Sequence, residues 1–139
     1  MKAFINEKKF AASAQTLFQA FEDPALLAQW WGPNGFSNTF ELFEFREGGK
    51  WKFVMHGPNG ANYPNECIFQ ELVPSRKVVI RHDCAPFFTL TVTIKEAQGG
   101  SMLHWNQDFD SEEVAHAVAP IVEPANREVL AKLERVVVG

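Results

Sequence analysis

The chain has 139 residues, of which 46% are hydrophobic and 13% aromatic, with 13 phenylalanines and 4 tryptophans. This length and composition predict a single globular domain over residues 1–139 that buries a sizeable core without disulfide bonds. The formal net charge of −4 offers no basic field for nucleic acid or for an anionic membrane surface, so we expect no nucleic-acid partner and no membrane insertion.

A strand and a helix are predicted at the start of the chain. Residues 2–10 form the strand. Ser13 is suited to the N-cap of a helix that extends through Glu22, because its hydroxyl accepts a hydrogen bond from an otherwise unpaired backbone N–H. Leu17, Phe18 and Phe21 share one face of this helix and indicate that it packs on a core.

A second, shorter helix carries two adjacent tryptophans. Asp23 is its expected N-cap, and Pro24 suits the first helical position, where a missing N–H costs nothing. Gly32 is expected to end the helix in the left-handed conformation. Trp30 and Trp31 need a large apolar surface to lie against. We expect Trp30 to anchor the helix on the core and Trp31 to border a cavity.

Residues 36–109 alternate between apolar and polar side chains, which is typical of strands with one solvated face. Turns are predicted at Gly48-Gly49, at residues 57–60, at Pro74-Ser75 and at Gly99-Gly100. No segment between these strands is long enough for a crossover helix, so the pattern predicts an antiparallel meander. The strands are expected at residues 36–45, 50–56, 63–72, 77–82, 88–94 and 102–109.

The first of these strands, residues 36–45, has apolar side chains in both phases. Phe40 and Leu42 alternate with Phe43 and Phe45. Such a pattern predicts either a β-bulge or a homodimer contact.

The last third of the chain predicts a long amphipathic helix. Asp110 or Ser111 caps it, and Pro120 and Pro124 are expected to kink or interrupt it near residues 118–124. Its apolar stripe continues to Val137. A curled sheet that holds this helix on its concave face is the simplest packing, and it leaves room for a pocket between sheet and helix.

Four motifs, in order along the chain, carry a resemblance to a known family. They are the D-P and W-W-G-P of residues 23–33, G-G-K-W-K-F-V-M-H-G-P-N-G at 48–60, Y-P-N-E-C-I-F-Q-E-L-V-P-S-R-K-V-V-I at 63–80, and N-R-E-V-L-A-K-L-E-R-V at 126–136. With them the chain resembles the AHSA1-like family (activator of Hsp90 ATPase homologue 1-like) of the START/Bet v 1-like SRPBCC superfamily.

The resemblance implies an α+β helix-grip fold. Its curved antiparallel sheet of about six to seven strands surrounds a long C-terminal helix, and two short helices follow the first strand. It also implies a hydrophobic cavity between the sheet and that helix. Many relatives have glycine where Cys67 stands, so we expect a more filled cavity wall at that point. The fold hosts carriers, enzymes and co-chaperone domains and does not define function by itself.

Metal binding and acid–base catalysis find little support among the histidines. The strand phase of His56 and His104 predicts that both point outward, and His116 has no partner at ligand spacing. Only His82 shares the inner phase of Val78 and Ile80. We therefore expect no metal and no cofactor.

Other reactive side chains are equally sparse. Cys67 and Cys84 lack Cys-x-x-Cys spacing, and in a chain that begins without an export signal they predict free thiols and a cytoplasmic location. Cys67 on an inner face reads as an inert small hydrophobe, although Cys84 and His82 are close enough in sequence for a Cys–His pair. Glu71 shares the phase of Phe69 and is a weak catalytic candidate with His82.

The inner-face side chains are predicted to surround one volume, which either forms a filled core or holds a ligand. Trp31 and Phe36 are placed at its mouth, and Gln107 and Asn126 supply the polar contacts that orient a ligand. The complete set of cavity candidates is Trp31, Phe36, Trp51, Phe53, Met55, Cys67, Phe69, Ile80, His82, Phe88, Leu90, Val92, Trp105, Gln107, Asn126, Leu130 and Leu133.

Three functions are consistent with this sequence. The first is binding of a small hydrophobic molecule, aromatic or polycyclic, without catalysis. The second is a cyclase/dehydratase-type enzyme that uses His82 or Glu71 as a proton shuttle in the same cavity. The third is a protein-binding module that associates with a chaperone, as the Hsp90 activator does, although no strip of Lys and Arg marks a docking surface. We favour the first.

Overall fold

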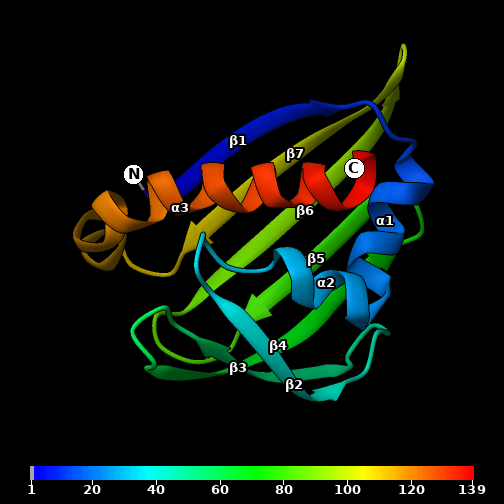
Figure 1. Cartoon of the computed structure of the whole chain (residues 1–139). Helices are drawn as coiled ribbons and strands as arrows, with labels where there is room; N and C mark the ends of the chain where they lie inside the picture. The colour runs from blue at the N-terminus through cyan, green and yellow to red at the C-terminus, as the bar shows by residue number, and fades with distance from the viewer. Residues whose placement is uncertain (1) are drawn as a thin grey trace.

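The computed structural model describes residues 2–139 and contains seven strands and three helices in these residues. Two helices follow the first strand, and the third lies at the C-terminus (Figure 1). In chain order the elements are β1 (Ala3–Phe10), α1 (Ala14–Glu22), α2 (Pro24–Trp30), β2 (Ser37–Phe43), β3 (Lys50–His56), β4 (Asn62–Val73), β5 (Lys77–His82), β6 (Phe88–Ala97), β7 (Gly100–Phe109) and α3 (Glu112–Val138).

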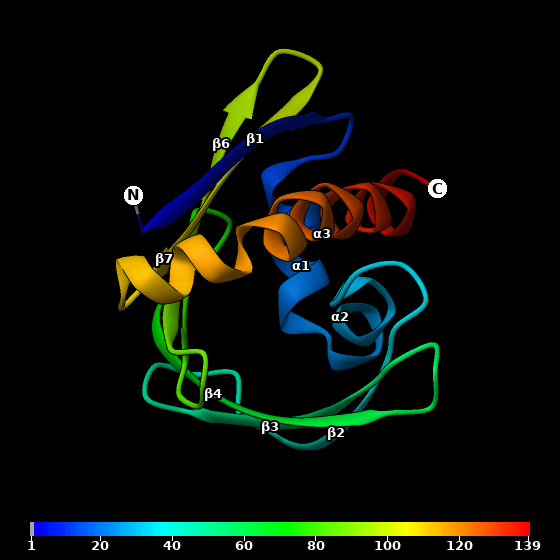
Figure 2. The same ribbon diagram turned by 90° about the vertical axis from the view of Figure 1, so that its left-hand side faces the viewer.

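All seven strands belong to one antiparallel sheet in the order β1-β7-β6-β5-β4-β3-β2. From β2 to β7 each strand pairs with the next in sequence. β1 pairs with β7 and forms one edge of the sheet, and β2 forms the other edge. The sheet curves around α3, with α1 and α2 on the same concave side (Figure 2). This is the expected antiparallel meander, and the fold is the α+β helix-grip fold.

The helix starts are where the capping residues predict them. The Ser13 hydroxyl accepts from the Thr16 N–H at 3.1 Å, and the Asp23 carboxylate accepts from the Ala25 N–H at 2.9 Å. Ser111, rather than Asp110, caps α3, because its hydroxyl accepts from the Val114 N–H at 3.3 Å. Short-range hydrogen bonding therefore sets all three starts.

Trp30 joins α1 to α2 through a buried hydrogen bond. Its indole Nε1–H donates to the Ala20 carbonyl at 3.0 Å, and both residues are fully buried. An α-helical carbonyl normally accepts from the N–H four residues on, which here is Pro24, a residue without an N–H. The indole replaces that missing donor.

Helix α3 runs without interruption from Glu112 to Val138 and contains both Pro120 and Pro124. Each proline removes one backbone hydrogen bond. Of the two predicted outcomes, a kink or an interruption, the structure shows a bend and no interruption (Figure 1). The first turns of α3 bend away from the axis of the remaining helix (Figure 1). Within residues 2–139, no helix combines the length and the apolar character needed to cross a membrane.

Two strands contain a register shift. In β2 the shift lies between Phe40 and Leu42, which confirms the bulge expected from the mixed phases of that strand. In β4 a second shift lies between Phe69 and Glu71. It reverses the phase, so Phe69 faces the core opposite Ile80 while Glu71 pairs with Val79 on the other face. The expectation that Glu71 shares the face of Phe69 is therefore wrong.

The core fills one end of the concave face. There the aromatic side chains of α2 and the first strands of the meander contact one another: Trp31 lies 5.0 Å from Trp51 between ring centroids, and Trp51 stacks on Phe53 at 4.2 Å. The C-terminal half of α3 adds Leu130 and Leu133. The middle of α3, residues 121–129, borders a pocket.

Candidate functional site

A pocket of about 510 Å³ lies between the sheet and α3. Its walls come from the loop after α2, from β3 to β7 and their connections, and from residues 121–129 of α3. None of the lining residues is Asp, Glu, Lys or Arg. They are Trp31, Gly32, Pro33, Phe36, Met55, Tyr63, Pro64, Asn65, His82, Ala85, Pro86, Phe88, Leu90, Trp105, Gln107, Ile121, Val122, Ala125, Asn126 and Val129.

The loop that follows α2 supplies one wall, and α3 holds it in place. The Lys132 ammonium donates to the carbonyl oxygens of Gly32 at 3.0 Å and Pro33 at 3.3 Å. The Glu128 carboxylate accepts from the Asn34 N–H at 3.0 Å. These contacts bring Trp31 and the loop to the side of α3.

Glycine at position 32 is favoured mainly by the backbone conformation. Its φ is +93°, in the region that favours glycine. A Cβ there would also lie 2.7 Å from the Met55 methyl carbon and 3.3 Å from the Phe36 Cβ. The Met55 methyl is the end of a flexible side chain that can move aside, so the positive φ is the stronger reason for glycine here.

His82, at the end of β5, is a buried member of the pocket wall with 6% of its surface exposed. Its Nδ1 lies 2.8 Å from the Pro86 carbonyl oxygen and its Nε2 lies 2.6 Å from Asn65 Oδ1. The ring stacks on Phe88 with centroids 4.4 Å apart. Burial lowers the pKa of His82 and outweighs the opposing backbone hydrogen bonds. Both ring nitrogens are thus engaged by protein atoms, which holds the imidazole in the wall.

Two amide side chains meet across the pocket. Asn126 of α3 donates from Nδ2 to Gln107 Oε1 of β7 at 3.0 Å, and the residues are 6% and 9% exposed. Trp105, two residues before Gln107 on the same face of β7, also lines the pocket. Its Nε1 is buried and has no hydrogen-bond partner within residues 2–139. These groups are the polar part of an otherwise apolar volume.

The cavity candidates from the sequence divide into two groups. The structure places Trp31, Phe36, Met55, His82, Phe88, Leu90, Trp105, Gln107 and Asn126 along the pocket. It places Trp51, Phe53, Cys67, Phe69, Ile80, Val92, Leu130 and Leu133 in the packed core instead. All eight residues of the second group are buried in the core cluster and do not line the pocket.

The catalytic candidates also separate. Glu71 lies outside the pocket and pairs with Lys77 at 3.0 Å, with 45% of its side chain exposed. Arg81 makes two 2.7 Å contacts to the Asp110 carboxylate. His82 alone of the two candidates reaches the pocket.

Both cysteines are free. Burial raises the pKa of the Cys67 thiol, which keeps it protonated in the core. The Cys84 sulfur lies 3.5 Å from His82 Nε2 and accepts from the Glu66 N–H at 3.5 Å. A Cys–His contact therefore exists, but Cys84 is outside the pocket lining.

The remaining histidines lie away from the pocket. His56 contacts Thr39 and Asn62 at 2.7 Å each, and His104 lies 3.9 Å from the Glu7 carboxylate. His116 is exposed on α3. Throughout residues 2–139, no three His, Cys, Asp or Glu side chains gather in a way that would hold a metal ion.

Sequence reasoning missed part of the wall. The missed residues Tyr63, Pro64 and Asn65 lie at the start of β4. The missed residues Ala85 and Pro86 lie in the loop between β5 and β6, where no alternation of apolar and polar residues is expected. On α3, the apolar residues Ile121 and Val129 were already visible as part of a stripe. Their spacing on a helix of 3.6 residues per turn was the signal that could have added Val122 and Ala125.

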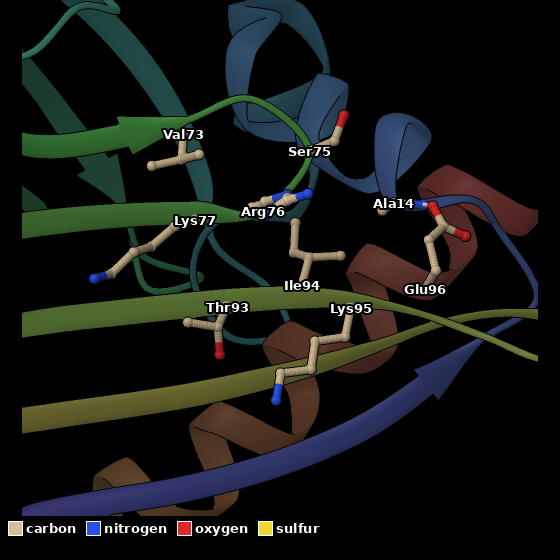
Figure 3. A pocket seen from close by; sticks show the side chains of 9 residues that line it. All are labelled: Ala14, Val73, Ser75, Arg76, Lys77, Thr93, Ile94, Lys95 and Glu96. Carbon is tan, nitrogen blue, oxygen red and sulfur yellow. Dashed lines mark hydrogen bonds between the residues drawn. The ribbon is translucent and has the colours of Figure 1, made fainter.

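A second depression, of about 650 Å³, lies beside the β4–β5 turn (Figure 3). Charged side chains line it, including Lys77, Lys95 and Glu96. The N-terminus of α1 at this place is already occupied, because the Ala14 N–H donates to the Glu96 carboxylate at 3.3 Å. Four of the nine residues that line the depression are charged, in contrast to the pocket between the sheet and α3, which has none.

Comparison with known proteins gives one family and a set of similar structures. A family model described as Activator of Hsp90 ATPase homolog 1-like protein matches residues 11–137. A search of curated proteins by sequence finds no match. A solved structure from Arthrobacter aurescens is 24% identical with a TM-score of 0.91, over 98% of this chain and 86% of that one.

Two further structures are similar over nearly their whole length. A protein from Nitrosomonas europaea is 15% identical with a TM-score of 0.89, over 98% of this chain and 94% of that one. The AHSA1 protein from Silicibacter pomeroyi is 21% identical with a TM-score of 0.78, over 96% and 95% of the two chains. At these identities the structures support the fold alone.

Proposed function

Because this chain belongs to the family of Activator of Hsp90 ATPase homolog 1-like proteins, we propose that it binds a small hydrophobic molecule, aromatic or polycyclic, in the pocket between the sheet and α3. The observation that carries the proposal is the character of this pocket. Its volume of about 510 Å³ lies within the usual range for small-molecule sites, roughly 300–1,000 Å³. Aromatic and aliphatic side chains form most of its wall, with few polar groups among them.

Binding is better supported than catalysis. A cyclase/dehydratase-type reaction in this pocket needs a side chain that gives or takes a proton. Glu71 is not among the lining residues, and His82 already has protein atoms within 2.8 Å of both nitrogens. A reaction would have to break one of these contacts before His82 could serve a substrate.

The test is a titration with the neutral apolar fluorophore N-phenyl-1-naphthylamine, whose emission rises in an apolar site. We expect saturable binding to the unmodified protein. Ala125→Phe places a ring in the pocket and should weaken binding about tenfold or more. Ala117→Phe is the matched control, because Ala117 is exposed on the same helix and outside the pocket. Equal loss in both variants, or no saturable binding at all, would refute the proposal.

A chaperone-associated function is the second candidate, favoured by the description of the family model. Exposed apolar side chains, above all Ile121 at 71% on α3, are available for such a contact. Stimulation of an Hsp90 ATPase by this chain, lost in Ile121→Glu, would support it; no stimulation would remove it.

The free thiols of Cys67 and Cys84 support a cytoplasmic location. Native mass spectrometry would test for a homodimer and a bound molecule together.

A further inference from the structure

The buried amide pair in the pocket wall has an unused hydrogen-bonding capacity. The bond from Asn126 to Gln107 consumes one N–H and one lone-pair direction. The Gln107 NH2 group and the Asn126 carbonyl oxygen remain, and neither has another partner within residues 2–139. A primary amide carries two N–H donors and an oxygen with two lone pairs, so one donor group and one acceptor are left over.

One NH2 group and one carbonyl oxygen are left over whichever way the two amides are oriented. If both were turned, Gln107 would donate to Asn126, and the pair would leave the Asn126 NH2 group and the Gln107 oxygen. In either arrangement one NH2 and one carbonyl oxygen stand side by side. Neither leftover group is among the fully buried unpaired atoms of residues 2–139, so both open on the pocket, where a ligand group can satisfy them in place of water.

The surroundings of the pair favour an uncharged partner. No Asp, Glu, Lys or Arg lines the pocket. The Lys132 ammonium is bound to the Gly32 and Pro33 carbonyl oxygens on the loop. Burial lowers the pKa of His82, which disfavours a positive charge in the pocket wall. A charged ligand group would lose its hydration here without gaining a counter-charge.

We propose that Gln107 and Asn126 form a subsite for a neutral ligand group that both donates and accepts a hydrogen bond, such as a carboxamide or hydroxyl on an aromatic body. The aromatic walls at Trp31, Phe88 and Trp105 take the body of the ligand. The unpartnered Trp105 Nε1–H is a further donor in the same wall. This inference rests on the proposed binding function and narrows it to one chemical class.

A matched series of naphthalene derivatives tests the subsite. Naphthalene-2-carboxamide donates and accepts, methyl 2-naphthoate only accepts, and 2-naphthoate is an anion at pH 7.5. We expect the carboxamide to bind about five- to tenfold more tightly than either of the others, measured by displacement of N-phenyl-1-naphthylamine. Equal affinities, or tightest binding of the anion, would overturn this inference and leave the proposed binding function standing. Binding of none of them, nor of the fluorophore, would overturn both.

A variant adds a control on the pair itself. The double substitution Gln107→Met with Asn126→Leu removes the polar groups at similar volume. It should keep the affinity for methyl 2-naphthoate and lose the preference for the carboxamide. A preference unchanged in the folded double variant would contradict the assignment. If that variant does not fold, the ranking of the three probes on the unmodified protein still decides.

Discussion

Replacing Trp30 with phenylalanine should destabilise the protein far more than the same change at Trp31. Trp30 is fully buried, and its indole N–H is the donor to the Ala20 carbonyl, whose normal helical donor is missing because residue 24 is proline. Trp31 has 9% of its surface exposed and lines the pocket, and its indole makes no comparable hydrogen bond within residues 2–139.

The magnitude follows from two contributions. A smaller ring in the same space costs about 1 kcal/mol through lost burial and residual cavity, and this cost is common to both variants. Trp30→Phe also leaves the buried Ala20 carbonyl unpaired, which costs about 1–3 kcal/mol more. We therefore expect Trp30→Phe to lower the free energy of unfolding by about 2–4 kcal/mol and Trp31→Phe by about 1 kcal/mol.

Urea unfolding followed by circular dichroism measures both free energies of unfolding. The m-values show whether the two variants unfold between comparable states. Titration with N-phenyl-1-naphthylamine supplies the complementary readout. Trp31→Phe should change the affinity for the probe, and Trp30→Phe should leave it nearly unchanged. Equal destabilisation by the two substitutions would refute the role of the Trp30 hydrogen bond, and an affinity change confined to Trp30→Phe would refute the division between anchor and pocket wall.

Three further predictions concern titration and reactivity. Burial lowers the pKa of His82 in the folded state, so its contribution to the free energy of unfolding is complete above pH 6.5. This contribution falls by up to about 1.4 kcal/mol per pH unit as the pH drops from 6.5 toward the lowered pKa. Urea unfolding across this range should show the loss of stability, and His82→Gln should abolish it. The Cys67 thiol, buried and with a raised pKa, should resist iodoacetamide in the folded protein while the half-buried Cys84 reacts; faster labelling of Cys67 would contradict the core placement. The Arg81 guanidinium lowers the pKa of Asp110, so Arg81→Gln should raise that pKa in an NMR titration, and an unchanged value would show that the paired geometry is absent in solution.

Local signals in the sequence predicted the helix starts and the strand order well. The cap at Ser13, the Asp23-Pro24 start of α2 and the turns between strands depend on neighbouring residues, so they are readable without a structure. The mixed phases of residues 36–45 likewise indicated the bulge at Phe40 and Leu42. The second bulge, between Phe69 and Glu71, leaves no mark in the apolar pattern, and the face of Glu71 was misjudged for that reason.

The extent of the pocket could not be predicted, because strand alternation shows which side chains face inward and not what covers them. Phe53 and Leu90 have the same inward orientation on different strands. Phe53 is covered by aromatic neighbours such as Trp31, whereas Leu90, which is equally buried, contributes to the pocket wall. That difference depends on where α2 and the two halves of α3 lie, which is a tertiary property.

The most direct test of the account is to locate a bound probe by NMR. Intermolecular NOEs between naphthalene-2-carboxamide and the methyl groups of the isotope-labelled protein would report the site. We predict NOEs to Met55, Leu90 and Val129, whose methyl groups line the pocket between the sheet and α3. NOEs to Val73 and Ile94, in the charged depression of Figure 3, or none at a saturating concentration of the probe, would contradict the claim that this pocket is the binding site.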